Sequence, residues 1–240
     1  MLKGRTALIT GASSGIGAAV ARRFAEEGAG LVLAARRADR LEALAAELRG
    51  LDAQVLVRPA DVTQEDQVVA LFADAEAFAP VDILVNNAGV AVHKPTLDVT
   101  LEDWRRVVDI NLTAAFLCAR EAMRAMKTRG RGKIINIGSL SAQMPRPDTI
   151  AYATTKFGVE GMTRSLALDG REHGVTASII HPGVTQSDLA ADARDLRPGP
   201  NMMAGESVAA AVTLMAAMPF ETNLLSATML PVAQPYLGRG

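Results

Sequence analysis

Residues 10–17 have the sequence TGASSGIG and join a short aliphatic run to a helical pattern. Gly11 would let the chain turn sharply out of a strand, Gly15 would let the backbone approach a phosphate, and Gly17 would let the helix pack closely. The start of that helix presents unpaired N–H groups and the positive end of its dipole. The stretch therefore predicts a turn that binds the pyrophosphate of a dinucleotide, with these residues at the cofactor: Gly11, Ser13, Ser14, Gly15, Ile16 and Gly17.

The rest of the chain alternates in the same way. Short apolar runs predict strands at Arg5–Thr10, Gly30–Ala35, Gln54–Pro59, Val81–Asn86, Gly132–Ser139, Val175–His181 and Ser226–Pro231. Longer patterns predict helices at Gly15–Glu27, Arg37–Arg49, Gln64–Ala79, Leu101–Thr128, Ala151–His173 and Gly205–Met218. Alternation of this kind indicates βαβ units, and nearly continuous apolar strands indicate helices on both faces. We expect an α/β single-domain Rossmann fold, with a doubly wound seven-stranded parallel sheet flanked by helices.

Composition excludes several classes of protein. The 240 residues carry 25 Lys and Arg against 26 Asp and Glu, which argues against a broad basic face for nucleic acid. Apolar residues make up 49%, enough for a sizeable core, so the composition is not that of a disordered chain. A single cysteine, Cys118, excludes an internal disulfide and any multi-cysteine metal site, and we expect no metal. The apolar run near the N-terminus is too short for a signal sequence or a membrane span, so we expect a cytoplasmic protein.

One stretch departs from the regular alternation. Between residues 188 and 205, charged residues are followed by a run rich in Pro and Gly, which predicts a short helix and then a loop. We expect this segment to be a lid over the substrate, within one domain that spans residues 1–240. The alternative is a plain surface connection.

The end of the second predicted strand bears on the choice of cofactor. NAD-binding folds place an acidic residue about 20 positions after the glycine turn, where it binds the ribose 2′-hydroxyl. Here that position is Ala35, and Arg36 and Arg37 follow it. A carboxylate that would repel a 2′-phosphate is missing, and two guanidinium groups suited to bind one are present. The pattern favours NADP over NAD, unless the two arginines are merely a solvated helix start.

Further motifs follow in a consistent order, and with them the chain resembles the classical short-chain dehydrogenase/reductase family from Arg5 to its C-terminus. The matching stretches are the glycine turn, Asp61-Val62, Asn86-Asn87-Ala88-Gly89, Asn111, Ser139, Tyr152-Ala153-Thr154-Thr155-Lys156 and Pro182-Gly183. The resemblance implies that Asp61 and Val62 lie near the adenine. It also implies that Asn87, Ala88 and Gly89 support the central sheet and the cofactor.

Tyr152 and Lys156 stand four residues apart in a helical pattern, so their side chains share one face. A free tyrosine has a pKa of about 10. We expect the ammonium of Lys156, together with an oxidised nicotinamide, to lower the pKa of Tyr152 and make it a proton donor and acceptor. The resemblance implies that Lys156 also hydrogen-bonds the nicotinamide ribose.

Two more residues complete the expected catalytic set. Ser139 ends a predicted strand at the edge where ligands bind α/β sheets, and its hydroxyl would stabilise a developing alkoxide. Asn111 matches the family asparagine that holds a water in a proton relay with the lysine. The expected catalytic residues are therefore Asn111, Ser139, Tyr152 and Lys156.

A last contact to the cofactor follows the strand that ends at His181. The family carries Pro-Gly and then a threonine that contacts the nicotinamide carboxamide. Pro182 and Gly183 match, and Ser187 takes the threonine position, while Thr185 stands where an aliphatic residue is common. Either Thr185 or Ser187 would make the contact.

Together these patterns predict an NADP-dependent ketone or keto-ester reductase that transfers a hydride between NADPH and a carbonyl or secondary alcohol carbon. The alternatives are an NAD-dependent alcohol dehydrogenase of the same fold and a non-catalytic NADP-binding sensor. We expect a substrate wall from Leu140–Ile150, His93 and the lid that is largely apolar, with Arg146 and Asp148 as exceptions. The apolar faces of the two longest helices, and the family's helical interfaces, predict a homotetramer with no nucleic-acid or membrane partner.

Overall fold

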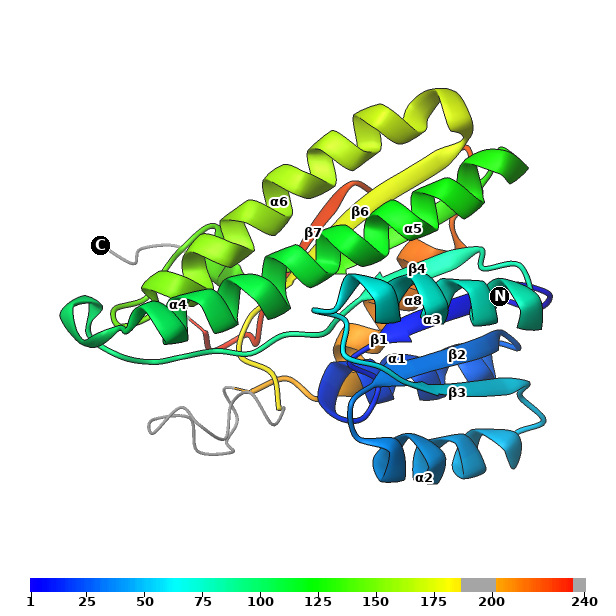
Figure 1. Cartoon of the computed structure of the whole chain (residues 1–240), viewed down its shortest axis with the longest axis horizontal. Helices are drawn as coiled ribbons and strands as arrows, with labels where there is room; N and C mark the ends of the chain where they lie inside the picture. The colour runs from blue at the N-terminus through cyan, green and yellow to red at the C-terminus, as the bar shows by residue number, and fades with distance from the viewer. Residues whose placement is uncertain (187–201, 235–240) are drawn as a thin grey trace.

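Seven parallel strands form the centre of the computed structural model, which describes residues 1–186 and 202–234 (Figure 1). The strands are β1 (Thr6–Thr10), β2 (Gly30–Ala35), β3 (Val55–Pro59), β4 (Ile83–Asn86), β5 (Gly132–Ile137), β6 (Val175–Pro182) and β7 (Ser226–Met229). Their order across the sheet is β3-β2-β1-β4-β5-β6-β7, so the direction of winding reverses between β1 and β4. The predicted doubly wound α/β fold is confirmed.

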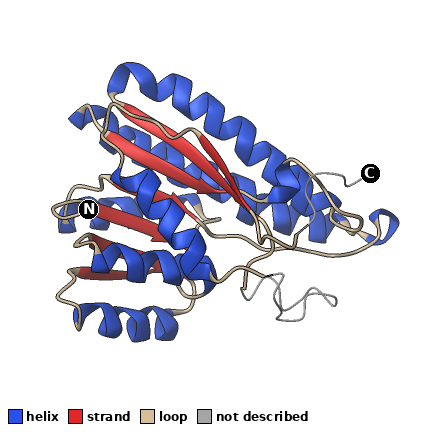
Figure 2. Ribbon diagram, turned by 180° about the vertical axis from the view of Figure 1, so that it is seen from behind, coloured by secondary structure: helices blue, strands red, loops and turns tan. Residues whose placement is uncertain are grey.

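Helices cover both faces of this sheet (Figure 2). One layer contains α1 (Gly15–Glu26), α2 (Ala38–Arg49) and α8 (Gly205–Ala217). The other layer contains α3 (Glu65–Phe78), α5 (Ala114–Arg129) and α6 (Ile150–Gly170), and α4 (Leu101–Val108) packs against α6. The predicted helices are present, with boundaries shifted by a few residues.

The nearly continuous apolar strands are explained by burial on both sides. In β1, Ala7 and Ile9 belong to the core that packs against α1 and α8, whereas Leu8 belongs to the core beneath α3 and α5. All three side chains are fully buried. Successive strand residues point to opposite faces, so a strand with helices on both sides has no position for a polar side chain in its middle.

The predicted helix Leu101–Thr128 is interrupted. A capping box between Thr100 and Asp103 begins α4, and a π-helical turn at Asp109–Thr113 then separates α4 from α5. Wide turns of this kind are rare and often mark functional sites, because they redirect a side chain without ending the helix. The side chain redirected here is that of Asn111.

Of the expected lid, only residues 202–205 belong to the described part of the chain. Residues 188–201 lie outside it, so the lid at 188–205 stays a prediction. Near its two ends Thr185 pairs with Met203: the N–H of Gln186 donates to the Met203 carbonyl, and the N–H of Met203 donates to the Val184 carbonyl, both at 2.9 Å. In residues 1–186 and 202–234, no helix is long and apolar enough to cross a bilayer.

Candidate active site

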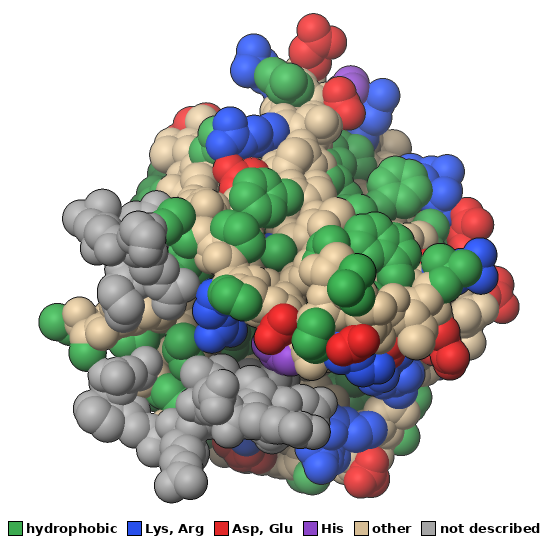
Figure 3. All heavy atoms as spheres, turned by 90° about the vertical axis from the view of Figure 1, so that its left-hand side faces the viewer, with side chains coloured by type: hydrophobic (Ala, Val, Ile, Leu, Met, Phe, Trp, Pro, Cys, Tyr) green, Lys and Arg blue, Asp and Glu red, His purple; other side chains and the backbone are tan. Residues whose placement is uncertain are grey.

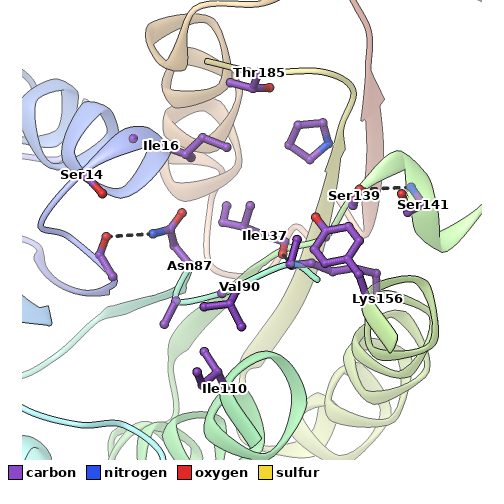
Figure 4. A pocket seen from close by; sticks show the side chains of 18 of the residues that line it. Ser14, Ile16, Asn87, Val90, Ile110, Ile137, Ser139, Ser141, Lys156 and Thr185 are labelled. Carbon is purple, nitrogen blue, oxygen red and sulfur yellow. Dashed lines mark hydrogen bonds between the residues drawn. The ribbon is translucent and has the colours of Figure 1, made fainter. Parts of the chain in front are cut away.

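A cavity of about 450 Å³ opens at the carboxyl ends of β1 and β4, where the strand order reverses. Ligands bind α/β sheets at this point because the loops from the two halves diverge there. Figure 4 shows Ser14, Ile16 and Asn87 on one wall, and Ser139 and Lys156 on the facing wall.

Most of the residues predicted at the site line this one cavity. They are Gly11, Ser13, Ser14, Gly15, Ile16, Arg36, Arg37, Asp61, Val62, Asn87, Ala88, Gly89, Ser139, Tyr152, Lys156, Pro182, Gly183 and Thr185. Gly17 and Asn111 lie behind its wall, and Ser187 lies outside the described residues. Across the described residues, no group of three or more His, Cys, Asp and Glu side chains is placed to hold a metal ion.

The glycine turn has the geometry that a phosphate needs. Gly11 has a φ of +65°, in the left-handed region that favours glycine. A Cβ on Gly17 would lie 2.5 Å from both the Gly11 carbonyl oxygen and Nδ2 of Asn87, so no larger residue fits there. The side chain of Ser14, which precedes α1, makes no bond to the helix N–H groups. The start of α1 therefore faces the cavity with those donors available.

Thr10 connects this turn to β4, and it is not among the residues predicted from the sequence. Its Oγ1 accepts hydrogen bonds from the backbone N–H of Asn87 (3.0 Å) and of Ala88 (3.2 Å). In return, Nδ2 of Asn87 donates to the carbonyls of Thr10 (3.0 Å) and Gly11 (3.2 Å). The one sequence signal that points to Thr10 is its position, because it is a polar residue at the end of an otherwise apolar strand.

Arg37 lies across the glycine turn, at the end of the cavity that is lined by the end of β2. Its Nη2 donates to Oγ of Ser13 (2.9 Å) and of Ser14 (2.8 Å). Arg36 is exposed beside it, and β2 ends at Ala35 with no carboxylate. The structure thus gathers two guanidinium groups and a serine at one rim, an arrangement that suits a phosphate dianion.

Tyr152 and Lys156 project from the first turns of α6. The ammonium Nζ of Lys156 lies 5.6 Å from the centre of the Tyr152 ring and donates to the carbonyl of Ile137 at 2.8 Å. The lysine is 6% exposed, and burial lowers its pKa to about 8. The carbonyl at the end of β5 therefore fixes the ammonium beside the tyrosine.

The pKa of Tyr152 departs from the expectation. Burial raises it above the usual value, and this outweighs the lowering by a hydrogen bond with the Ser139 side chain and by the charge of Arg146. Burial is the largest of these effects on the pKa of Tyr152. The protein by itself thus favours the protonated phenol.

Asn111 holds the loop that follows β4. Its Oδ1 accepts from the N–H of Val90, and its Nδ2 donates to the Val90 carbonyl, both at 2.8 Å. Nδ2 also donates to Oγ1 of Thr155, one residue before Lys156, at 3.2 Å. The asparagine side chain thus joins the π-helical turn to α6 and to the cavity wall. Its role in a water relay stays a prediction.

A buried histidine supports Ser139 from behind and is absent from the predicted site. His181, at 0% exposure, has Nδ1 3.0 Å from the Ser139 carbonyl oxygen and Nε2 3.3 Å from a carboxylate oxygen of Glu160. Burial lowers the pKa of His181. A Cβ on Gly138 would lie 2.7 Å from Nδ1, so the backbone of β5 approaches the ring closely.

The end of the cavity beyond Tyr152 carries both apolar and basic side chains. Met144 lines it as predicted, but so do three basic side chains, His93, Arg106 and Arg146. Asp148, expected there, does not line the cavity. Arg106 is the addition to the expected wall, because it comes from α4, which the order of the sequence does not place near Tyr152. The largely apolar character of the wall, which was expected to include the lid, stays a prediction.

Near the end of β6, Thr185 lines the cavity, and its hydroxyl donates to the Gly183 carbonyl at 3.1 Å. The N–H of Val184 donates to the side chain of Gln234 at 2.8 Å, which brings the C-terminal segment to this wall. Which of Thr185 and Ser187 contacts the nicotinamide carboxamide stays a prediction.

Comparisons of the sequence with known proteins identify the family of this chain. The sequence model of the family described as short chain dehydrogenase matches residues 5–197. The D-beta-hydroxybutyrate dehydrogenase of Rhizobium meliloti (strain 1021) is 40% identical over 188 residues, which cover 77% of this chain and 73% of that protein.

Two solved structures share the fold over nearly the whole chain. An alcohol dehydrogenase from the archaeon Thermococcus sibiricus, complexed with 5-hydroxy-NADP, has a TM-score of 0.90 at 26% identity, covering 97% of this chain and 98% of that one. A 3-ketoacyl-(acyl-carrier-protein) reductase from Brucella melitensis, complexed with NADH, has a TM-score of 0.87 at 30% identity, covering 95% and 97%.

Proposed function

This chain belongs to the short-chain dehydrogenase family, and we propose that it is an NADP-dependent carbonyl reductase. In this proposal a hydride passes between NADPH and the carbonyl or secondary alcohol carbon of a ketone or keto ester. The observation that carries the proposal is the convergence of Ser139, Tyr152 and Lys156 on one cavity that also contains the glycine turn. A dinucleotide at that turn would extend along the cavity toward the three side chains.

The residues of the cavity fit a dinucleotide. The turn at residues 11–17 and the start of α1 would hold the pyrophosphate, with Asp61 and Val62 at the adenine. Across the described residues Arg36 has no ion-pair partner, so its guanidinium is available to a 2′-phosphate. The solved relatives include both an NADP and an NADH complex, so the choice of NADP rests on Ala35, Arg36 and Arg37 of this chain.

The bound nicotinamide donates or accepts the hydride, and the protein's own groups handle the proton. Ser139 would donate a hydrogen bond to the substrate oxygen, which stabilises negative charge as it develops. Tyr152 would give its hydroxyl proton to the same oxygen, and its raised pKa keeps that proton in place until it is needed. Lys156, held by the Ile137 carbonyl, would orient the nicotinamide ribose and with Asn111 replace the proton.

A direct assay tests this function. Purified protein is given NADPH or NADH with a panel of ketones and keto esters, and the loss of absorbance of the reduced nicotinamide is followed. We expect turnover with NADPH and much weaker turnover with NADH. Preference for NADH would identify an NAD-dependent alcohol dehydrogenase. Binding of NADPH without turnover of any substrate would identify a sensor.

We also propose a homotetramer in the cytoplasm, built from one domain over residues 1–240 with a lid at 188–205. Phe116 on α5 and Phe157 on α6 support the oligomer, because they are 47% and 49% exposed on adjacent helices. Figure 3 shows hydrophobic side chains gathered on the face that carries α4 and the starts of α5 and α6. Burial of such a patch between chains is favourable.

A further inference from the structure

Two arginines, Arg106 and Arg146, give the described part of the cavity end next to Tyr152 a positive charge, and His93 lies beside them. His93, Arg106 and Arg146 line this end from three different segments: the loop after β4, helix α4, and the connection between β5 and α6. Among the described residues that line the cavity, the only acidic side chain is that of Asp61. Asp61 follows β3, at the opposite side of the sheet from β5 and Ser139, so it does not offset this charge.

Arg146 is held where its charge reaches the reacting groups. It is half-buried, and its carbonyl accepts a hydrogen bond from the buried hydroxyl of Thr149 at 2.6 Å. The N–H of Lys94 donates to the carbonyl of Asp148 at 3.0 Å, which ties the same segment to the loop that carries His93. The guanidinium acts on Tyr152 through its charge. A group bound to Arg146 would therefore lie close to the substrate carbon.

Arg106 and Arg146 are not paired with an acidic side chain within residues 1–186 and 202–234. No carboxylate in those ranges forms an ion pair with Arg106 or Arg146. Arginines of α5 and of the turn that follows it do form such pairs: Arg120 with Glu65, Arg129 with Glu76, and Arg131 with Asp82. A guanidinium that lines a cavity next to the reacting groups, and that forms no ion pair with a described carboxylate, is matched to an anionic ligand.

We propose that the substrate is an oxo acid, or in the reverse direction a hydroxy acid, whose carboxylate binds Arg146 with Arg106 across the cavity. This inference rests on the proposed function, since it selects the acid over the neutral ketone or ester as substrate. The carboxylate takes no part in the chemistry: the hydride from NADPH goes to the carbonyl carbon, and the proton of Tyr152 goes to its oxygen. A planar guanidinium binds a carboxylate through two parallel N–H bonds, which fixes the carbonyl relative to Ser139 and Tyr152.

Matched pairs of substrates test the proposal on the full chain. Oxo acids of four to six carbons, with the carbonyl at position 2, 3 or 4, are compared with their methyl esters in the presence of NADPH. We expect at least one acid to exceed its ester at least 10-fold in kcat/KM, and its KM to rise with ionic strength. An ester preference across the whole panel overturns the inference but leaves the reductase function intact.

Substitutions of single arginines then test which of them binds the substrate carboxylate. In Arg146→Ala the acid-to-ester ratio of kcat/KM should fall about 10- to 100-fold, as for the loss of a charged hydrogen bond, mainly through the KM of the acid. Arg146→Lys should restore part of it, and Arg106→Ala should give a smaller fall. Arg105→Ala is the matched control, because Arg105 is an exposed neighbour on α4 that does not line the cavity.

Two further measurements distinguish failure of this inference from failure of the proposed function. Thermal stabilisation of Arg146→Ala by NADPH, at the level of the wild type, establishes that the variant is folded and binds cofactor. With that established, an unchanged acid-to-ester ratio in Arg146→Ala overturns the inference. Absence of turnover of every acid and every ester by the wild-type protein, despite NADPH binding, overturns the proposed function instead.

Discussion

Nδ1 of His181 lies 3.0 Å from the carbonyl oxygen of Ser139, so a buried ring on strand β6 fixes the backbone of the residue that faces Tyr152. A carbonyl oxygen only accepts hydrogen bonds, which places the ring proton on Nδ1. In this tautomer Nε2 carries a lone pair, so it forms no hydrogen bond with the Glu160 carboxylate oxygen that lies 3.3 Å away, and Glu160 is paired with Arg164. The position of Ser139 thus depends on a histidine that is kept in one tautomer.

His181 should make the fold less stable in mild acid. Burial lowers its pKa, with Lys156 and Arg164 acting in the same direction and the Ser139 carbonyl and Glu160 opposing. The unfolded histidine, with a pKa of about 6.5, therefore binds more protons than the folded one, and stability falls as pH drops below about 6.5. His181→Asn should flatten this dependence in urea unfolding between pH 5 and 8, whereas His173→Asn, in the turn after α6, should keep it. Equal slopes in wild type and His181→Asn would contradict the assignment.

Tyr152→Phe should abolish most of the chemistry and spare the cofactor. The ring and its packing remain, but the proton for the substrate oxygen is lost, so kcat should fall roughly 10²- to 10⁴-fold. Binding of NADPH, measured by fluorescence, should stay near the wild-type value because, in the proposed binding mode, the turn at residues 11–17 holds the phosphates. In the wild type, alcohol oxidation should rise with pH, since burial raises the pKa of Tyr152 and the phenolate forms late. A variant with near wild-type kcat would exclude Tyr152 as the proton donor.

Arg36→Ala should weaken the binding of NADPH and leave the binding of NADH unchanged. Loss of a charged hydrogen bond to the 2′-phosphate should raise the KM for NADPH about 10- to 100-fold and leave the KM for NADH unchanged. Ala35→Asp, which places a carboxylate at the end of β2, should move the preference further toward NADH. Steady-state kinetics with both cofactors measures the two effects. Equal losses with NADPH and NADH in Arg36→Ala would refute the 2′-phosphate site.

Lys156→Met should lose activity and cofactor affinity while the fold becomes no weaker near neutral pH. Burial lowers the pKa of Lys156 to about 8, so between pH 8 and about 10.5 the unfolded lysine binds more protons than the folded one. Wild-type stability should therefore rise across that window by about 3 kcal/mol at most, and the variant should not share the rise. Tm values of both proteins at pH 7.5 and pH 10 test this. A parallel pH response in the two proteins would show that Lys156 is not desolvated.

Light scattering at micromolar concentration should give four times the 25.2 kDa mass of one chain. Phe116→Glu combined with Phe157→Glu should lower that mass, because charges replace apolar groups on adjacent helices. Leu168→Glu is the matched control, as an exposed apolar residue far along α6 from Phe157. A wild-type mass of one chain would exclude the tetramer.

The sequence by itself determined the features that depend on neighbours along the chain. The turn at residues 10–17, the strands with two buried faces and the spacing of Tyr152 from Lys156 are all encoded within windows of a few residues. In such windows, side-chain periodicity and glycine geometry restrict the backbone directly. The doubly wound class of the sheet followed from the same local units, because crossovers between parallel strands allow few arrangements.

Only the tertiary structure decided which distant residues complete the site. Thr10 bonds to Asn87, Asn111 to Val90 and His181 to Ser139 across 21 to 77 positions of sequence. Arg106 reaches the cavity only because α4 packs against α6, and the burial that raises the pKa of Tyr152 comes from segments far apart in the chain. Such contacts depend on the order of strands in the sheet and on desolvation, which are properties of the packed molecule and leave no periodic mark in the sequence.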